Sequence, residues 1–213
     1  MYSQEKRLKN NIAILGGSFN PIHNGHLKLA IKAYESFPVS KVLIIPNYST
    51  YYKEDAGKDA TSDRVEMVKL AIKDYPYMEF SDIEIRRAGV TYTIDTIEEL
   101  LNDDPSLKIY FIIGGDSLQY IDKWKRAEEL LSKVTILTAV RDDVDTKKSR
   151  RLIADLKSRY VNADIRLMDM KGVVISSSDI RNRVMAGISI EGLVPPQVEE
   201  YIINNGLYKN QEK

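Results

Sequence analysis

The chain contains no cysteine, so disulfide bonds, thiolate zinc sites and a cysteine nucleophile are excluded. It has no excess charge either, because 31 acidic side chains balance 31 basic ones. General binders of nucleic acid or of membrane surfaces usually carry a basic excess, so we expect neither kind of partner. No apolar run approaches the roughly 20 residues that cross a bilayer. The apolar residues 12–15 are also too few for a secretion signal, and these absences together predict a soluble, cytoplasmic protein.

Glycine and proline are scarce, with 11 and 7 residues among 213, which argues against a low-complexity chain. Apolar residues make up 43% of the sequence, which is too many for a disordered chain. A chain of this length can bury a sizeable core. We expect a single domain over residues 1–213, with an N-terminal extension at about residues 1–10.

Short runs rich in isoleucine and valine alternate with amphipathic stretches up to about residue 170. Buried parallel strands have the first composition, and helices with one apolar face have the second. The predicted strands are 12–15, 42–45, 79–85, 109–113, 134–140 and 165–168, and the predicted helices are 25–36, 63–73, 94–102, 126–132 and 149–158. Strand–helix alternation predicts an α/β fold with a doubly wound parallel sheet.

The C-terminal part of the chain shows a different pattern. Residues 172–208 predict a helical lobe, with short helices at 180–185 and 195–205. Residues 141–151 are highly charged and predict a surface connection that leads into a helix. We see no repeat and no long linker in the sequence.

The only two histidines, His23 and His26, lie three positions apart in the segment GGSFNPIHNGH at residues 16–26. This segment follows a predicted strand, and Asn24 is a plausible N-cap that would place His26 in the first helical turn. Backbone N–H groups and the positive end of the helix dipole would meet there, which predicts an anion site. Two alternatives to an anion site remain. The histidines could bind a metal, although no third ligand is evident nearby, or both could be structural. Neither Gly-x-Gly-x-x-Gly nor a P-loop occurs, so the dehydrogenase and P-loop classes are not supported.

Five ordered segments resemble a known family. Residues 16–26 look like the first signature of the HxGH nucleotidyltransferases, and ISSSDIR at 175–181 looks like their second. Three further segments are similar to bacterial nicotinate-nucleotide adenylyltransferases: RAGVTYTIDT at 87–96, FIIGGDS at 111–117 followed by Trp124, and residues 194–208. The resemblance covers residues 11–208 and implies a Rossmann-like fold.

The chain departs from the family pattern at a few positions. Asn20 stands where the family usually has Asp, which suggests a structural position rather than a proton carrier. Ser18 and Ser178 replace Thr but keep the hydroxyl. Tyr52 and Lys53 stand where the family often has His-Lys, so Lys53 is the matching cation while the missing histidine weakens the phosphate contacts expected there.

The resemblance implies transfer of the adenylyl group of ATP to nicotinate mononucleotide, which gives deamido-NAD and pyrophosphate in NAD biosynthesis. It implies catalytic roles for His23, His26, Arg181 and Lys53. It implies ATP binding by Gly16, Gly17, Ser18, Phe19, Gly25, His26, Gly114, Ser177, Ser178 and Arg181. It implies nicotinate mononucleotide binding by Thr93, Asp116, Trp124 and Lys53. Mg²⁺ would be carried by the ATP phosphates, with no protein metal site.

Several alternatives stay open at this point. Ser176 to Asp179 form a helix cap by composition, and a capped helix N-terminus is also an anion site. Trp124 could pack in the core, although its lysine neighbours favour the surface. A sister transferase acting on phosphopantetheine or another nucleotide substrate, and a nucleotide-binding regulator without turnover, are the rival functions. The sequence leaves the oligomeric state open, a homodimer included.

Overall fold

The computed structural model describes residues 8–48, 59–140, 143–170 and 175–209. Lys53 therefore lies outside the described residues. The strands are β1 (Leu8–Gly17), β2 (Val39–Pro46), β3 (Met78–Phe80), β4 (Lys108–Ile113), β5 (Val134–Val140) and β6 (Asp164–Asp169). The helices are α1 (Asn24–Ser36), α2 (Asp59–Ile72), α3 (Ile83–Arg87), α4 (Thr93–Asp103), α5 (Gly115–Leu118), α6 (Ala127–Lys133), α7 (Asp143–Arg159), α8 (Ser177–Met185) and α9 (Pro196–Asn204).

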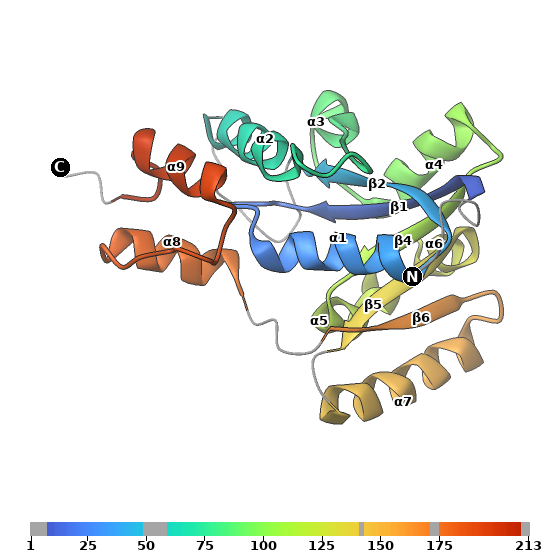
Figure 1. Cartoon of the computed structure of the whole chain (residues 1–213). Coiled ribbons are helices and arrows are strands. Elements are labelled where there is room, and N and C mark those ends of the chain that lie inside the picture. The colour runs from blue at the N-terminus through green and yellow to red at the C-terminus, as the bar shows by residue number, and fades with distance from the viewer. Residues whose placement is uncertain (1–7, 49–58, 141–142, 171–174, 210–213) are drawn as a thin grey trace.

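The strands form one sheet in the order β3-β2-β1-β4-β5-β6, and every neighbouring pair is parallel (Figure 1). This is the doubly wound Rossmann order, so the predicted α/β fold is confirmed. The strand order reverses between β1 and β4, which are adjacent in the sheet. Crevices for ligands lie at the carboxyl ends of the strands at such a switch point.

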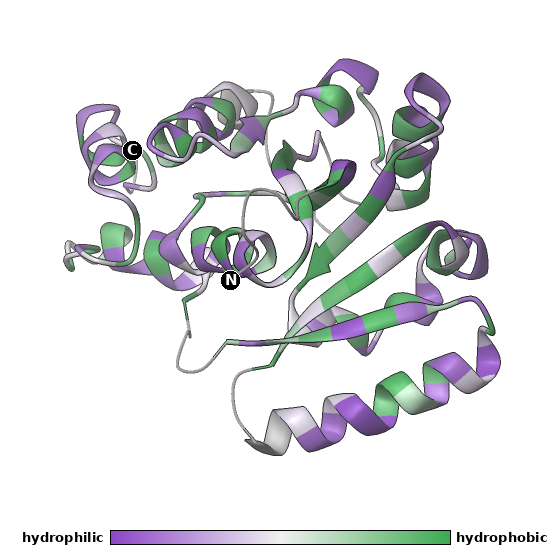
Figure 2. Cartoon of the chain, turned by 45° about the vertical axis from the view of Figure 1, so that its right-hand side comes forward, coloured by the Kyte–Doolittle hydropathy of each residue, from purple (hydrophilic) through white to green (hydrophobic). Residues whose placement is uncertain are grey.

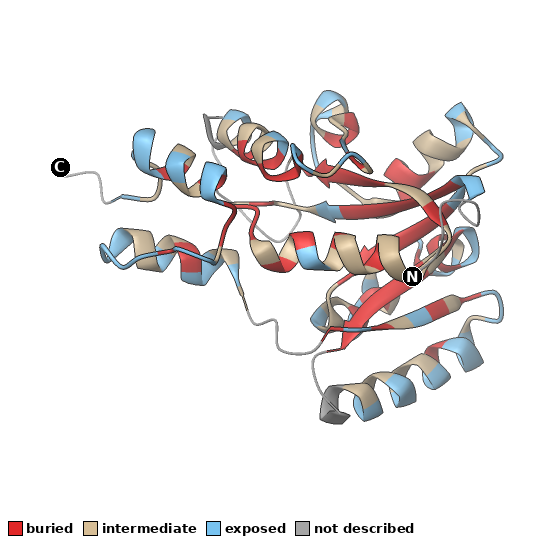
Figure 3. Ribbon diagram, viewed as in Figure 1, coloured by how far each residue is buried: buried red, intermediate tan, exposed pale blue. Residues whose placement is uncertain are grey.

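Both faces of the sheet are buried. Successive side chains of a strand point to opposite faces, so each strand contributes to two core clusters. Ala13 and Leu15 of β1 belong to one core cluster, together with residues of α1, α2, α8 and α9. Ile12 and Ile14 belong to the other, together with residues of α3, α4, α6 and α7. Figure 3 shows the buried strands between helices whose exposed residues face outward. Figure 2 shows the matching pattern of hydropathy, with hydrophobic strands and hydrophilic outer helix faces.

Two predicted elements need correction. The predicted strand 79–85 is the short strand β3 followed by α3, because the alternating Ile83 and Ile85 resemble a strand although Ile83 enters the core from a helix. The predicted surface connection 141–151 is largely helix, since α7 begins at Asp143. Its charged residues lie on a helix whose buried Leu156 anchors it to the sheet.

The C-terminal helices α8 and α9 lie beyond the carboxyl ends of β1 and β2, beside the start of α1 (Figure 1). Ile180 of α8 and Val198 and Ile202 of α9 are fully buried in the same cluster as α1. The backbone N–H of Asn24 donates to the carbonyl of Leu193 at 2.9 Å. The C-terminal part of the chain is therefore fastened to the segment that follows β1. Among the described residues, no helix is long and apolar enough to cross a membrane.

Candidate active site

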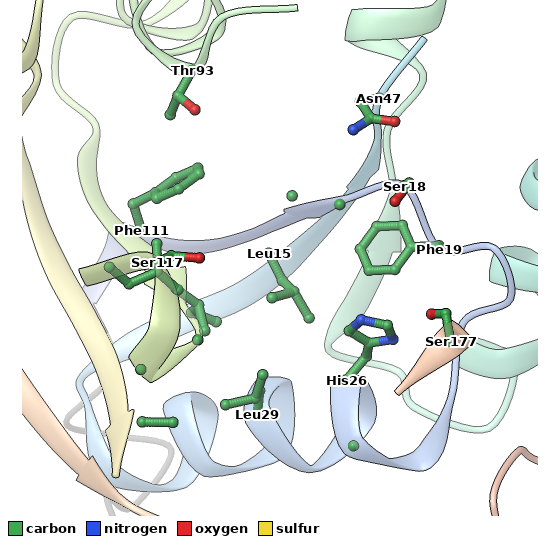
Figure 4. A pocket seen from close by; sticks show the side chains of 18 of the residues that line it. Leu15, Ser18, Phe19, His26, Leu29, Asn47, Thr93, Phe111, Ser117 and Ser177 are labelled. Carbon is green, nitrogen blue, oxygen red and sulfur yellow. The ribbon is translucent and has the colours of Figure 1, made fainter. Parts of the chain in front are cut away.

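A cavity of about 1310 Å³ opens at the carboxyl ends of β1 and β4 (Figure 4). Ligand pockets commonly measure about 300–1,000 Å³, so this one has room for more than one small molecule. Its walls are the β1–α1 turn, the start of α1, the end of β4 with α5, residues 91–93 and 123–125, and residues 175–178. The cavity lies at the switch point of the sheet, where the fold predicts a ligand site.

The β1–α1 turn is held closely against the rest of the fold. Phe19 has a φ of 46° and is 1% exposed, and its ring meets the His26 ring edge to face at 5.0 Å. A Cβ atom added to Gly17 would lie 3.1 Å from the Phe19 ring, so glycine suits this position. The turn thus brings its backbone and His26 to one wall of the cavity.

His23 and His26 bind each other's backbone. The N–H of His23 donates to Nδ1 of His26 at 3.2 Å, and the N–H of His26 donates to Nδ1 of His23 at 3.4 Å. The two rings stack with their centroids 3.6 Å apart. His23 is therefore the N-cap of α1, and the prediction of Asn24 as N-cap was wrong because the imidazole takes over the capping bond. His26 does lie in the first turn, as the sequence predicted.

These bonds fix the proton positions on both rings. A neutral imidazole carries one proton, and here both Nδ1 atoms accept hydrogen bonds, so the proton sits on Nε2 of each ring. Burial lowers the pKa of His23 from 6.5 to about 4. Burial, with a smaller contribution from His23, holds the pKa of His26 well below 6.5. At neutral pH each of these two rings, which both line the cavity, therefore carries an Nε2–H donor.

The segment 175–181 is fastened to the same turn. Ser176 caps α8 by accepting the N–H of Asp179 at 3.1 Å, which confirms the capping interpretation. Ser177 donates to the carbonyl of Pro21 at 2.9 Å. Arg181 donates to the carbonyl of Asn20 at 2.7 Å and to the hydroxyl of Ser178 at 3.2 Å. Ser177 and Ser178 line the cavity, and Arg181 lies one helical turn behind them, outside its lining.

Asn20 is held from two sides of the C-terminal region. Its Oδ1 accepts the hydroxyl of Tyr208 at 2.6 Å, and its carbonyl accepts from Arg181. The amide side chain thus links the β1–α1 turn to the end of the chain. This geometry agrees with a structural rather than a proton-carrying position.

The opposite end of the cavity holds Thr93 and Trp124, two of the predicted mononucleotide residues. Thr93 begins α4 and lines the cavity, as does Trp124. The rings of Trp124 and Phe111 meet edge to face with their centroids 6.2 Å apart, so Trp124 both packs against the core and lines the cavity. Asp116 is exposed in α5 and lies outside the lining, between Gly115 and Ser117, which belong to it.

The cavity wall also contains two residues that the sequence analysis did not single out. Asn47 follows β2 and is 8% exposed. Glu84 of α3 is 7% exposed; it accepts the hydroxyl of Thr96 at 2.7 Å, which in turn accepts from Arg87 at 2.8 Å. Burial raises the pKa of Glu84. Nothing in the sequence indicates that either residue would line a cavity. Glu84 lies in the predicted strand 79–85, and Asn47 only follows the predicted strand 42–45.

Known proteins similar to this chain match it over nearly its whole length. The family model described as cytidylyltransferase-like matches residues 14–183. A "probable nicotinate-nucleotide adenylyltransferase" of Lachnoclostridium phytofermentans is 40% identical over 92% of this chain and 98% of the relative. One of Caldicellulosiruptor bescii, with the same description, is 40% identical over 93% of this chain and 98% of its own. The chain belongs to the nicotinate-nucleotide adenylyltransferase family.

The fold agrees with that membership. A solved structure of the Plasmodium falciparum nicotinic acid mononucleotide adenylyltransferase complexed with NaAD superposes with a TM-score of 0.75. It is 21% identical and covers 93% of this chain and 97% of its own, so it supports the fold alone. The resemblance to the nicotinate-nucleotide adenylyltransferases seen in the sequence is thereby confirmed.

Proposed function

We propose that this chain transfers the adenylyl group of ATP to nicotinate mononucleotide, giving deamido-NAD and pyrophosphate in NAD biosynthesis. The observation that carries the proposal is the pair of neutral, mutually capped histidines at the wall of a cavity large enough for two nucleotides. Membership of a family whose relatives are described as nicotinate-nucleotide adenylyltransferases supports the choice of substrates.

The reaction needs no protein nucleophile. An oxygen of the mononucleotide 5′-phosphate attacks the α-phosphorus of ATP, and the bond from that phosphorus to the pyrophosphate oxygen breaks. Catalysis then rests on aligning two polyanions and stabilising charge on the phosphoryl oxygens. The Nε2–H groups of His23 and His26 supply donors for that charge, and their neutral state at pH 7 makes them donors without a change of protonation.

The ATP side of the proposed site is the β1–α1 turn and the start of α8. The Ser178 hydroxyl can donate to the β- and γ-phosphates, and the Ser177 hydroxyl can do so once it turns from the Pro21 carbonyl. Arg181 adds a charged fork once it turns from the Asn20 carbonyl. The other proposed contacts are the turn residues Gly16, Gly17, Ser18 and Phe19, with Gly25 at the start of α1 and Gly114 after β4. Mg²⁺ would be coordinated by the ATP phosphates and would keep most of its waters.

The mononucleotide side is the end of the cavity at Thr93 and Trp124. The pyridine ring of nicotinate mononucleotide is cationic at nitrogen, and an indole face is the best protein partner for a cationic ring. The hydroxyl and N–H of Thr93, at the N-terminus of α4, meet the ring carboxylate. Asp116 takes ribose hydroxyls by a change of side-chain position, and Lys53 adds a cation for the phosphate.

The test is release of pyrophosphate from Mg-ATP by the full chain, with a panel of three acceptors. We expect release with nicotinate mononucleotide and weaker release with nicotinamide mononucleotide, whose amide sets an NH₂ against donors placed for a carboxylate. Phosphopantetheine serves as the acceptor of a sister transferase and should give none. Release with phosphopantetheine alone would assign the chain to that sister activity, and release with no acceptor of the panel would contradict the proposal.

A further inference from the structure

Arg64 of α2 is a buried cation that no part of the proposed reaction uses. It is 1% exposed and is the largest of the fully buried side chains. Its guanidinium donates to the carbonyl of Ser18 at 2.7 Å and to the carbonyl of Asn47 at 2.8 Å. It also donates to the hydroxyl of Thr61 at 3.2 Å. All the strong partners of this cation are therefore neutral oxygens.

No carboxylate among the described residues pairs with Arg64. Its Nε is buried and has no hydrogen-bond partner in the described part of the chain. A buried charge without a counter-ion is unfavourable unless an opposite charge comes near it. Arginine nevertheless stays protonated in proteins, so the positive charge persists.

The neighbours of Arg64 show where the opposite charge would come from. Ser18 and Asn47 both line the cavity, whereas Arg64 lies behind them and does not (Figure 4 labels both). Asn47 also donates its N–H to the carbonyl of Gly17 at 3.0 Å. The guanidinium thus sits directly under the wall formed by the β1–α1 turn and the end of β2.

The hydrogen bonds of Arg64 also orient the peptide groups of that wall. In a trans peptide the C=O of one residue and the N–H of the next point in opposite directions. Because the carbonyl of Ser18 points at Arg64, the N–H of Phe19 points away from Arg64. The same holds for Asn47 and the N–H of Tyr48. Two carbonyl oxygens are therefore held at Arg64, and the N–H of Phe19, which lines the cavity, points away from Arg64.

From this geometry we infer that Arg64 is a positioning residue that gives the cavity a fixed positive charge and a donor-facing turn for the polyphosphate of its nucleotide. The inference deepens the proposed adenylyl transfer, since it concerns the same cavity. The anion never touches Arg64. The guanidinium acts through the Ser18 and Asn47 peptides and through its own charge.

The experiment compares Arg64→Gln, Arg64→Lys and the matched control Arg151→Gln, which removes an exposed arginine of α7 outside the cavity lining. The probe is inorganic tripolyphosphate, with its Kd measured by calorimetry on the full chain. We expect Arg64→Gln to raise this Kd about tenfold, which corresponds to about 1.4 kcal/mol. Arg64→Lys should stay within about threefold of the wild type although it melts at a lower temperature. Arg151→Gln should match the wild type, because water and salt screen exposed charges.

Each outcome decides the inference. Equal losses of affinity in the Gln and Lys variants would reduce Arg64 to a structural clamp, and an unchanged Kd in folded Arg64→Gln would remove its role. Failure of the wild type to bind tripolyphosphate would also overturn it. If Arg64→Gln does not fold, Arg64→Lys decides: a Kd within threefold supports the fixed charge, and a tenfold rise contradicts it. Binding of tripolyphosphate needs no turnover, so failure of the adenylyl transfer would leave this result readable.

Discussion

At the scale of single residues, the mutual capping of His23 and His26 decides what the cavity wall offers to a phosphate. The Nδ1 atom of each ring accepts a backbone N–H, so the Nε2–H is the only polar ring group left to bind a phosphate. Burial lowers the pKa of both rings and keeps them neutral at pH 7. The pair is thus a set of fixed donors rather than an acid and a base.

Replacing His26 by alanine should lower kcat by about 100-fold or more, because a donor placed at developing phosphoryl charge contributes about 3 kcal/mol. His23→Ala should have a similar or smaller effect on kcat, and it also removes the N-cap of α1. Steady-state kinetics with a melting curve for each variant checks this. A folded His26→Ala protein with near-normal kcat would remove the assigned role.

Protonation of His23 should also make the fold sensitive to acid. Its pKa is about 4 when folded and about 6.5 when unfolded, so the unfolded chain binds more protons between these values. The stability that comes from keeping His23 neutral is fully present above pH 6.5, and this stability is lost as the pH falls toward 4. We expect it to lower the free energy of unfolding by about 3 kcal/mol from pH 7 to pH 4.

Urea unfolding of the wild type and of His23→Asn at several pH values measures this effect. Both proteins carry the same carboxylates, so the difference between their pH profiles isolates the histidine. Parallel profiles between pH 7 and pH 4 would show that His23 is not buried and neutral.

At the scale of elements, α8 and the end of the chain hold the β1–α1 turn from outside the sheet. Arg181 and Tyr208 both bind Asn20, and Ser177 binds Pro21. Burial raises the pKa of the Tyr208 phenol, so it stays a hydroxyl donor at neutral pH. The turn that carries the histidines is therefore positioned by residues more than 150 positions away in the sequence.

Asn20→Asp should leave kcat/KM within about threefold, less than 1 kcal/mol, because a carboxylate oxygen accepts the Tyr208 hydroxyl as the amide oxygen does. The measurement is kcat/KM for both substrates. A gain of two orders of magnitude would mean that the present chain is an impaired member of its family, and would favour the regulator over the enzyme.

Arg181→Ala should reduce kcat/KM for ATP by about 30-fold or more, since a charge-assisted fork to phosphate contributes roughly 2–3 kcal/mol when water is excluded. The KM for the mononucleotide should change less. Arg183→Ala is the matched control on the same helix, because Arg183 pairs with Asp179 near the surface. If both variants behave alike, Arg181 has no special contact with ATP.

The elements also show what the sequence could and could not predict. Strands β1, β2, β4 and β5 were predictable because buried parallel strands need continuous apolar runs. Helix α3 was not, since Ile83 and Ile85 alternate as in a strand and only packing reveals the helix. The histidine cap was missed because asparagine is the common N-cap and imidazole is not. Glu84 binds Thr96, and Arg64 binds the carbonyl of Ser18. These partners are distant in the sequence, so no local pattern predicts the contacts.

At the scale of the whole molecule, the cavity joins two chemically different ends. Neutral histidines and serines line one end, and Trp124 with Thr93 lines the other. The doubly wound sheet brings both ends to the carboxyl edges of β1 and β4. Two substrates can then meet between them without a group of the protein entering the bond that forms.

This division predicts separable effects on the two substrates. Trp124→Ala should raise KM for nicotinate mononucleotide about tenfold and leave KM for ATP nearly unchanged, because cation–π stacking contributes roughly 0.5–2 kcal/mol. A rise of both KM values would indicate damage to the fold through the lost Phe111 contact. No change in either would show that Trp124 does not touch the ring.

The most direct test of the central claim follows oxygen atoms from nicotinate mononucleotide whose phosphate carries ¹⁸O in its non-ester oxygens. Direct attack of that phosphate on the α-phosphorus of ATP keeps every label in the dinucleotide, and the bridging oxygen of ATP leaves with pyrophosphate. Mass spectrometry of the products should therefore find all the ¹⁸O in deamido-NAD and none in pyrophosphate. Label in pyrophosphate, or AMP as the released product, would contradict adenylyl transfer at this site.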